Sequence, residues 1–480
     1  MRSFVSAVAV AVAAVLTATG CAGAGASGSS SLGGPASLVP ADAVAFVALE
    51  TDLAPAQLRV VDGLLSRFPA RDVLLARLRQ GLEGRARVSW AGDVRPALGS
   101  ELDLVALAGS PAQLVVLTRP PDQTKFDELL AKLGGGVVLR QFGDWTAVST
   151  SVDALGALEH VTAPLADAGP YQAAMSKLAG DALVRAYADG AQARRLLTSL
   201  PGQVVATPPP VRARFGAFGR TIGAYAPERF GWGAADVVAV DGGVRVEAFT
   251  RAAPPSLYAI QHSRLVQLRT DAYVPLLIDE IPAGALLVAD YQAVQGEFEN
   301  ADPATLPAWL KELYARYPVL SYELDNLVGG ETAIYVRAGM PLPEITFVTQ
   351  PADVDRAISV LPEVLAELEG TFPPLARLTI RHAVIGGQLV LSTSAGGIAA
   401  FRAPGAKLRD DPAFEEATKA AGLPERTTGF VYADLKAALP LLRTLAPKAG
   451  LGDLAALTSL TAYGTRTGAE SSYMLFLQVQ

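Results

Sequence analysis

Two pairs of polar side chains occur in the same local sequence, Tyr-Ala-Asp, in the two halves of this 480-residue chain: Tyr187 with Asp189, and Tyr432 with Asp434. A carboxylate beside a phenol could bind a ligand or assist proton transfer. The same spacing also suits a structural role, in which the tyrosine packs beneath a helix and the aspartate caps the start of that helix. The sequence favours the structural role and leaves the ligand-binding role open.

The single cysteine, Cys21, follows an N-terminal segment that has the parts of a secretory signal. Arg2 supplies a positive charge, residues 4–16 are almost all Val, Ala and Leu, and small residues precede the cysteine. This arrangement resembles the bacterial lipoprotein box, in which the cysteine is diacylated and becomes the first mature residue. The resemblance implies a signal peptide over residues 1–20 and lipidation of Cys21. The alternative is a secreted protein with an incidental cysteine.

Residues 21–37 then form a lipidated cysteine and a tether rich in Gly, Ala and Ser, a composition typical of flexible linkers. No later stretch reaches the roughly 18 consecutive apolar residues that indicate a membrane-spanning helix. Acylation of Cys21 would leave no thiol for a disulfide, a metal ligand or a nucleophile. We therefore expect the lipid alone to hold the chain at the extracytoplasmic face of the cell membrane.

Familiar catalytic motifs are missing from the sequence. There is no Gly-x-Ser-x-Gly turn of a serine hydrolase, and the glycine runs at 134–136 and 329–330 lack the Lys-Ser/Thr of a phosphate-binding loop. The three histidines, His160, His262 and His382, are too far apart to predict a metal site. An aromatic content of 7% disfavours a glycosidase. We expect no catalytic residue, no metal, no cofactor and no enzymatic activity.

The charge pattern excludes another class of partner. The chain has 40 basic and 47 acidic residues, a formal charge of −7, and its basic residues are scattered rather than gathered in a stripe. Nucleic-acid-binding domains need a concentrated basic surface. We therefore expect no nucleic-acid partner.

The elements that must position these residues occur in the same order twice, which predicts an internal duplication. Each copy opens with a Pro-Ala step into a strand, at Pro40 and at Pro282. A strand hairpin, a helix with an acidic cap, a Ser-Thr-Ser strand (149–151 and 392–394), a second helix and a closing hairpin follow in both copies. The Ser-Thr-Ser runs are interpreted as half-exposed strand positions. The predicted boundaries are 38–250 for the first repeat, 251–277 for a connector and 278–480 for the second repeat.

Strand pairs beside helices, rather than strict alternation of strand and helix, indicate an α+β fold. We predict two tandem diverged repeats, each a largely antiparallel or mixed sheet with helices packed on one side.

The opening run from Val39 to Val47, with Pro40-Ala41-Asp42 near its start, precedes a helical pattern that ends at Pro69. This layout resembles the bacterial DUF3352 family (domain of unknown function 3352), whose members start with such a strand and are often secreted or lipid-anchored. The resemblance covers most of the mature chain, although Gly284 replaces the aspartate in the second copy. It implies no known reaction, cofactor or catalytic residue.

The sequence thus predicts a membrane-anchored extracytoplasmic lipoprotein whose repeats form a non-catalytic binding or scaffolding surface, with an envelope protein as its partner. The alternative is a carrier of a lipid or other apolar ligand. That alternative is motivated by the envelope location and by a mean hydropathy of +0.30, which large cores explain equally well.

Overall fold

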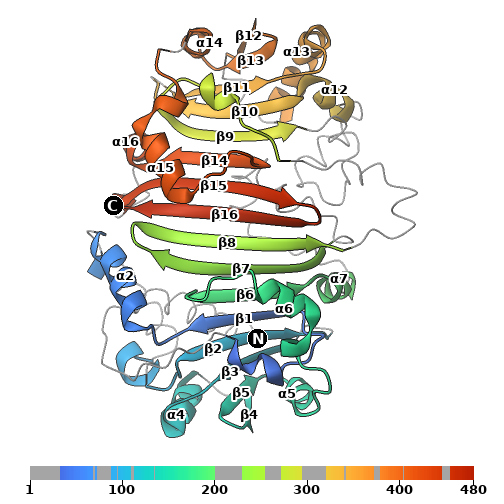
Figure 1. The fold of residues 1–480 in the computed structure, drawn as a ribbon, viewed down its shortest axis with the longest axis vertical. Coiled ribbons are helices and arrows are strands. Elements are labelled where there is room, and N and C mark those ends of the chain that lie inside the picture. Colours follow the sequence, from blue (N-terminus) through green and yellow to red (C-terminus); the bar gives the residue numbers. More distant parts are fainter. Residues whose placement is uncertain are drawn as a thin grey trace. The chain divides into compact units, whose positions relative to one another are not determined.

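The computed structural model describes residues 33–68, 71–72, 88–94, 96–109, 113–133, 136–199, 230–253, 272–293, 320–339, 342–371, 379–403, 405–445 and 454–480. The chain divides into two units (Figure 1). The first unit contains the described residues up to Ser199, Phe230–Ala253 and the last two residues, and the second contains the described residues from 272 to Gln478. Most of the predicted connector lies outside the described residues.

The first unit is built on an antiparallel sheet with the strand order β8-β7-β6-β1-β2-β3-β5-β4. Runs of Val, Leu and Ala form its inner strands, as expected for residues that pack well on a pleated surface. The strands are β1 (Ala45–Glu50), β2 (Glu101–Leu107), β3 (Gln113–Thr118), β4 (Val138–Phe142), β5 (Trp145–Ser149), β6 (Val184–Asp189), β7 (Phe230–Val240) and β8 (Gly243–Ala252).

Helices of the first unit connect these strands. Asp122 accepts hydrogen bonds from the Thr124 and Lys125 N–H groups at the start of α4, as its place before an apolar periodic run predicts. The helices are α2 (Pro55–Ser66), α4 (Gln123–Leu133), α5 (Val152–Glu159), α6 (Gly169–Met175) and α7 (Gly190–Ser199), with the 3-10 helices η1 (Gly34–Leu38) and η3 (Leu165–Asp167) and a π-helical turn η2 (Trp90–Val94).

The second unit is built on an antiparallel sheet with the strand order β16-β15-β14-β9-β10-β11-β13-β12. Its closing hairpin turns at Gly468, whose φ of 62° favours glycine. The strands are β9 (Ala285–Ala293), β10 (Gly330–Arg337), β11 (Glu344–Thr349), β12 (Arg381–Ile385), β13 (Gln388–Ser392), β14 (Gly429–Asp434), β15 (Leu457–Thr467) and β16 (Glu470–Val479).

Helices of the second unit follow the same plan. Asp353 accepts a hydrogen bond from the Arg356 N–H at the start of α13, as Asp122 does for α4. The helices are α12 (Leu320–Leu327), α13 (Val354–Thr371), α14 (Ala395–Arg402), α15 (Pro412–Ala421) and α16 (Leu435–Leu445), with the 3-10 helices η6 (Leu277–Asp279) and η8 (Leu408–Asp410).

The strand order of one unit matches that of the other, strand by strand, from β1 and β9 to β8 and β16. The match extends to irregular segments. In the first unit the Leu165 N–H donates to the Val39 carbonyl at 2.7 Å, and in the second the Leu408 N–H donates to the Ile281 carbonyl at 2.8 Å. The chain is therefore a mixed α/β protein on large antiparallel sheets.

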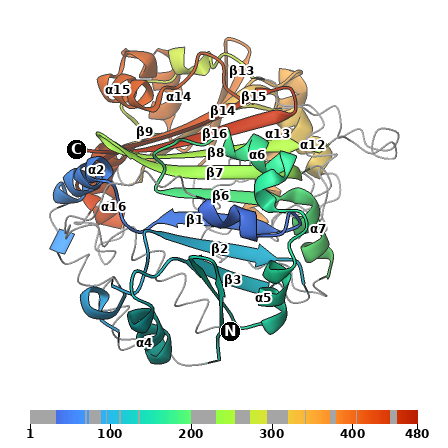
Figure 2. The same cartoon turned by 60° about the horizontal axis from the view of Figure 1, so that its bottom comes forward.

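Helices cover both faces of each sheet, so the prediction that they pack on one side is wrong. In β5, Ala147 belongs to the core beneath α5 and α6, whereas the next residue, Val148, belongs to the core beneath α4. Figure 2 shows α4 and α5 well apart, on either side of β3. In β13, Val390 faces α14 and α15, whereas Leu389 faces α13. Successive strand residues point to opposite faces. The sequence signal was the run of apolar residues at both parities, which indicates strands buried on both faces.

Candidate functional site

The first predicted pair, Tyr187 with Asp189, lies at the end of β6. Tyr187 is 2% exposed, and its ring meets the Tyr171 ring edge to face with centroids 5.2 Å apart. Asp189 Oδ1 accepts the Gln192 N–H at 2.9 Å, which caps α7, and the Tyr187 hydroxyl donates to Asp189 Oδ2 at 3.5 Å. Burial raises the pKa of Tyr187 above its ordinary value.

The second pair, Tyr432 with Asp434, has the same geometry at the end of β14. Tyr432 is 1% exposed, and its ring meets Phe414 of α15 edge to face at 5.0 Å. Asp434 Oδ1 accepts the Ala437 N–H at 2.8 Å at the start of α16. In both halves the tyrosine packs against one helix, α6 or α15, and the aspartate caps the next, α7 or α16. The structural interpretation was therefore right about the two roles and wrong in assigning both to a single helix.

Other residues that stood out in the sequence have different outcomes. Cys21 and His262 lie outside the described residues. The Ser-Thr-Ser runs were interpreted as half-exposed, but Ser149 and Ser392 are buried. Their hydroxyls tolerate burial because each donates to a carbonyl of the neighbouring strand, that of Leu114 or Ile345. The last serine of each run caps the helix that follows, since Ser151 accepts from Ala154 and Ser394 from Gly397.

A constellation that the sequence did not predict lies on β2, where Glu101 and Asp103 point to the same face of the sheet. The two side chains are 1% and 0% exposed. Glu101 Oε1 accepts the backbone N–H of Gly33 at 2.5 Å and that of Gly34 at 3.3 Å, at the start of η1. Among the described residues, no group donates to either Asp103 oxygen or to Glu101 Oε2. The pair is a buried carboxyl dyad.

The electrostatics of this dyad follow from its burial. Removal from water, and then the adjacent Glu101 carboxyl, raise the pKa of Asp103 well above its ordinary value. The Arg119 guanidinium, 3.9 Å from Glu101 Oε2, opposes that rise. Glu50, opposite Glu101 in the β1–β2 register, also has a raised pKa, chiefly from burial.

The second unit holds an equivalent dyad, Glu331 of β10 with Asp290 of β9, 4% and 2% exposed. Glu331 Oε1 accepts the Leu277 N–H at 2.7 Å, at the start of η6. The Tyr273 hydroxyl donates to Asp290 Oδ1, whereas no group in the described part of the chain donates to Asp290 Oδ2. Burial and the Glu331 carboxyl raise the pKa of Asp290 well above its ordinary value.

The two dyads occupy matching places although their aspartates come from different strands. In the first unit Asp103 lies opposite Ala48, and in the second Ala333 lies opposite Asp290. Aspartate and alanine have exchanged sides across the same strand pair. The sequence signal was faint, because an acidic residue inside an apolar strand is conspicuous only when its partner strand is known.

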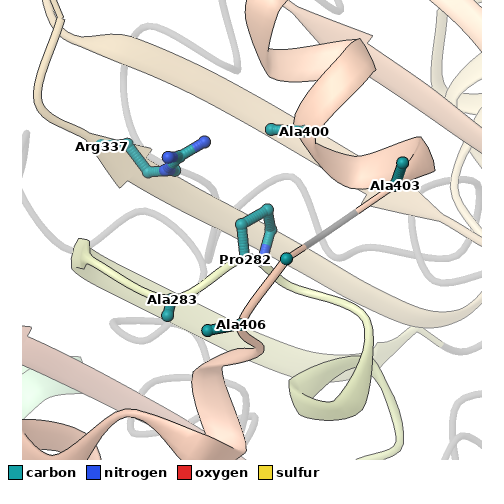
Figure 3. Close-up of a pocket in the computed structure, with 7 residues that line it drawn as sticks. Pro282, Ala283, Arg337, Ala400, Ala403 and Ala406 are labelled. Atoms are coloured by element: carbon teal, nitrogen blue, oxygen red, sulfur yellow. The ribbon is translucent and has the colours of Figure 1, made fainter.

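A small pocket lies in the second unit beside the segment that enters β9 (Figure 3). Its volume is about 200 Å³, below the roughly 300–1,000 Å³ of small-molecule sites. Arg337 supplies its charge and is 3.4 Å from Glu344 Oε1. The lining residues are Pro282, Ala283, Arg337, Ala400, Ala403, Gly405 and Ala406.

Two further findings concern the described part of the chain. It contains no helix with both the length and the apolar character to cross a membrane. It also contains no group of three or more His, Cys, Asp or Glu side chains placed to hold a metal ion.

Comparisons with known proteins assign no family. No family model matches the chain, and no curated protein matches it. Among solved structures, the chain is similar to the structure of crystal form I of TP0453, with 9% identity and a TM-score of 0.23, over 49% of this chain and 85% of that one. A likeness this low supports no conclusion about fold or function.

Proposed function

We propose that this protein is an extracytoplasmic lipoprotein, anchored to the cell membrane through Cys21, and that its folded body is a non-catalytic binding or scaffolding module of the cell envelope. The observation that carries the proposal is the apolar segment of residues 4–16 followed by small residues and the single cysteine. Its partner would be an envelope protein. The likeness of residues 39–47 to the DUF3352 family is part of the same proposal.

The geometry of the polar side chains supports a non-catalytic body. The two Tyr-Asp pairs are used in packing and helix capping, and the two carboxyl dyads are closed off from solvent. A substrate must reach the group that transfers its proton. Among the described residues, these buried groups are therefore better suited to holding the fold than to turnover.

The matching strand orders support a duplicated module. The same strand order, helix caps and entrance hydrogen bonds recur in both units. We infer that the two units are diverged tandem repeats of one ancestral fold. A duplicated body of this kind would offer two related surfaces to a partner.

Anchoring is tested by expressing the full chain and its Cys21→Ser variant in a bacterial host fed with labelled palmitate. The wild-type protein should incorporate label and partition into the detergent phase of a cloud-point extraction, whereas the variant should do neither because it lacks the acceptor thiol. A wild-type protein found unlabelled in the aqueous phase would contradict the proposal.

The binding role is separated from the alternative, a carrier of a lipid or other apolar ligand, by native mass spectrometry. The chain from Gly23 onward retains every described residue and would be purified without denaturation. A bare protein, with an envelope protein captured by cross-linking in intact cells, agrees with the scaffold. A stoichiometric lipid adduct would replace it with the carrier.

A further inference from the structure

The Asp103 carboxyl is surrounded by groups that fix its protonation. Among the described residues its oxygens have no donor, and the Glu101 carboxyl, two residues earlier on the same face of β2, also lacks a donor at Oε2. Two ionised carboxylates at this depth would repel each other without solvent. A single proton between them removes one charge and supplies the missing hydrogen bond. The same logic applies to Asp290 and Glu331.

The proton belongs on the aspartate of the first dyad. Glu101 already has polar partners, because two backbone N–H groups donate to its Oε1 and Arg119 Nη2 lies 3.9 Å from its Oε2. Asp103 has no such support. The other titratable or charged groups that influence this region are Glu50 of β1, Tyr171 of α6 and Arg185 of β6.

The second dyad has a different set of neighbours but the same result. The Leu277 N–H donates to Glu331, and the Tyr273 hydroxyl donates to Asp290 Oδ1, which leaves Asp290 Oδ2 to bear the proton. Glu280 and Tyr291 are the other titratable groups that influence this site. Its aspartate lies on β9, the counterpart of β1, whereas the aspartate of the first dyad lies on β2. The two units therefore share the position of the dyad in the sheet and not a sequence motif.

Each dyad holds the segment through which the chain enters its unit. Glu101 caps η1, and the following residues are tied down where the Leu165 N–H donates to Val39 and the Ala41 N–H donates to Ala163. Glu331 caps η6 in the same way, and Leu408 and Ala283 make the matching bonds. A second charge on the dyad would be relieved if this segment lifted and admitted water.

We propose that the Glu101–Asp103 and Glu331–Asp290 dyads are proton-dependent latches: one proton shared within each dyad keeps η1 or η6 docked, and loss of that proton at higher pH opens the segment. The proposal does not depend on membrane anchoring or on the identity of a partner.

The sign of the pH effect follows from the docked state, which binds one more proton than the open state. An aspartate exposed by opening ionises near pH 3.9, whereas the docked aspartate keeps its proton to a higher pH. Docking of the entrance segment is therefore strongest at low pH and weakens as the pH rises through the pKa of the aspartate in the docked state. For a step that releases one proton, the opening constant rises up to tenfold per pH unit.

The test is hydrogen exchange of the whole protein, read by mass spectrometry from about pH 5 to about pH 9, with rates corrected for the intrinsic pH dependence of amide exchange. Peptides containing Gly33–Leu38 and Leu277–Asp279 report the two latches. The wild-type protein should lose protection in both peptides by up to tenfold per pH unit. In Asp103→Asn the first peptide should become pH-independent, because an amide N–H can donate to Glu101 at every pH.

In Asp103→Asn, the peptide containing Leu277–Asp279 serves as an internal control. Its dyad is intact, so its protection should depend on pH as in the wild-type protein. In Asp290→Asn, the peptide containing Leu277–Asp279 should become pH-independent and the peptide containing Gly33–Leu38 should keep the wild-type pH dependence. Asp122→Asn, which changes an exposed capping carboxylate, should leave both slopes unchanged. Corrected protection that is flat with pH in the wild-type protein would overturn the proposal, even if neither dyad variant folds. An unchanged slope in the first peptide of a folded Asp103→Asn variant would also overturn it.

Discussion

Gly397 and Ala154 are the third residues of equivalent helices, counted from the capping serines Ser394 and Ser151. Only the second unit needs glycine there. A Cβ on Gly397 would lie 2.2 Å from Ser392 Oγ and 2.9 Å from Thr346 Oγ1. Those two hydroxyls hydrogen-bond to each other at 3.0 Å in a buried position. Side-chain crowding, rather than backbone conformation, therefore excludes alanine from this site.

Gly397→Ala should lower the free energy of unfolding by roughly 1–3 kcal/mol, because overpacking forces the two hydroxyls apart. Gly156→Ala is the matched control, since nothing lies within 4 Å of a Cβ at that position in α5. It should raise the free energy of unfolding by about 0.5–1 kcal/mol. Denaturant unfolding of both variants provides the measurement, and equal effects would contradict the steric argument.

The two capping serines should differ in their contribution. Ser394 Oγ accepts the Gly397 N–H at 2.8 Å and donates to Glu344 Oε2 at 2.5 Å, whereas Ser151 Oγ accepts the Ala154 N–H at 3.3 Å. Replacement of a capping serine by alanine costs about 0.5–2 kcal/mol. The loss of unfolding free energy should lie toward the upper end of this range for Ser394→Ala and toward the lower end for Ser151→Ala. Denaturant unfolding midpoints of the two variants measure both losses. The reverse order would show that the Glu344 contact is unimportant.

At the scale of elements, the exchange of aspartate and alanine between paired strands can be reproduced by mutation. Asp103→Ala removes the proton-bearing group, and Ala48→Asp alone adds a further carboxyl beside Glu50, Glu101 and Asp103. The double variant recreates the arrangement of Asp290 and Ala333. It should be more stable than the sum of the single effects predicts, with a coupling of about 0.5–3 kcal/mol. A double-mutant cycle in denaturant measures this coupling, and additive effects would contradict the equivalence of the two dyads.

The elements themselves were largely predictable from the sequence, and their environment was not. For the closing hairpin of the first unit, the run Asp241-Gly242-Gly243 predicts a turn, and β7 and β8 turn at Asp241 and Gly242, with Gly243 already in β8. The capping roles of Asp122 and Asp353 were also predictable, because caps act within three residues of themselves. Which faces of β5 and β13 are covered depends on how the helices before and after each strand pack back onto the sheet, and the local sequence does not specify that packing. The second dyad was missed because Asp290 meets Glu331 only after β9 and β10 pair. The first was missed because the run Glu101-Leu102-Asp103 does not itself show that both carboxyls are buried.

At the scale of the whole molecule, the dyads should make stability fall as the pH rises. Each aspartate has a raised pKa in the folded protein. Its contribution to stability is therefore fully present below the pKa of the unfolded chain, near 3.9, and is lost as the pH rises through the pKa of the folded state. The Asp103→Asn/Asp290→Asn double variant removes both terms. Relative to it, the wild-type protein should lose up to about 1.4 kcal/mol per pH unit per dyad.

Thermal unfolding of both proteins across a pH series measures that difference. The comparison with the double variant cancels the contributions of the other carboxylates, which the two proteins share. A difference that stays constant with pH would contradict a shared proton in either dyad.

The position of Glu101 also has a mechanical consequence. The bonds from Gly33 and Gly34 to its carboxylate, followed by those at Val39 and Ala41, are made by the chain before β1 begins at Ala45. For a chain anchored at Cys21, as proposed, a pulling force from the membrane would load these bonds in turn before any strand of the sheet. The entrance segment would therefore be the first part to yield, and one proton would set the force at which it does so.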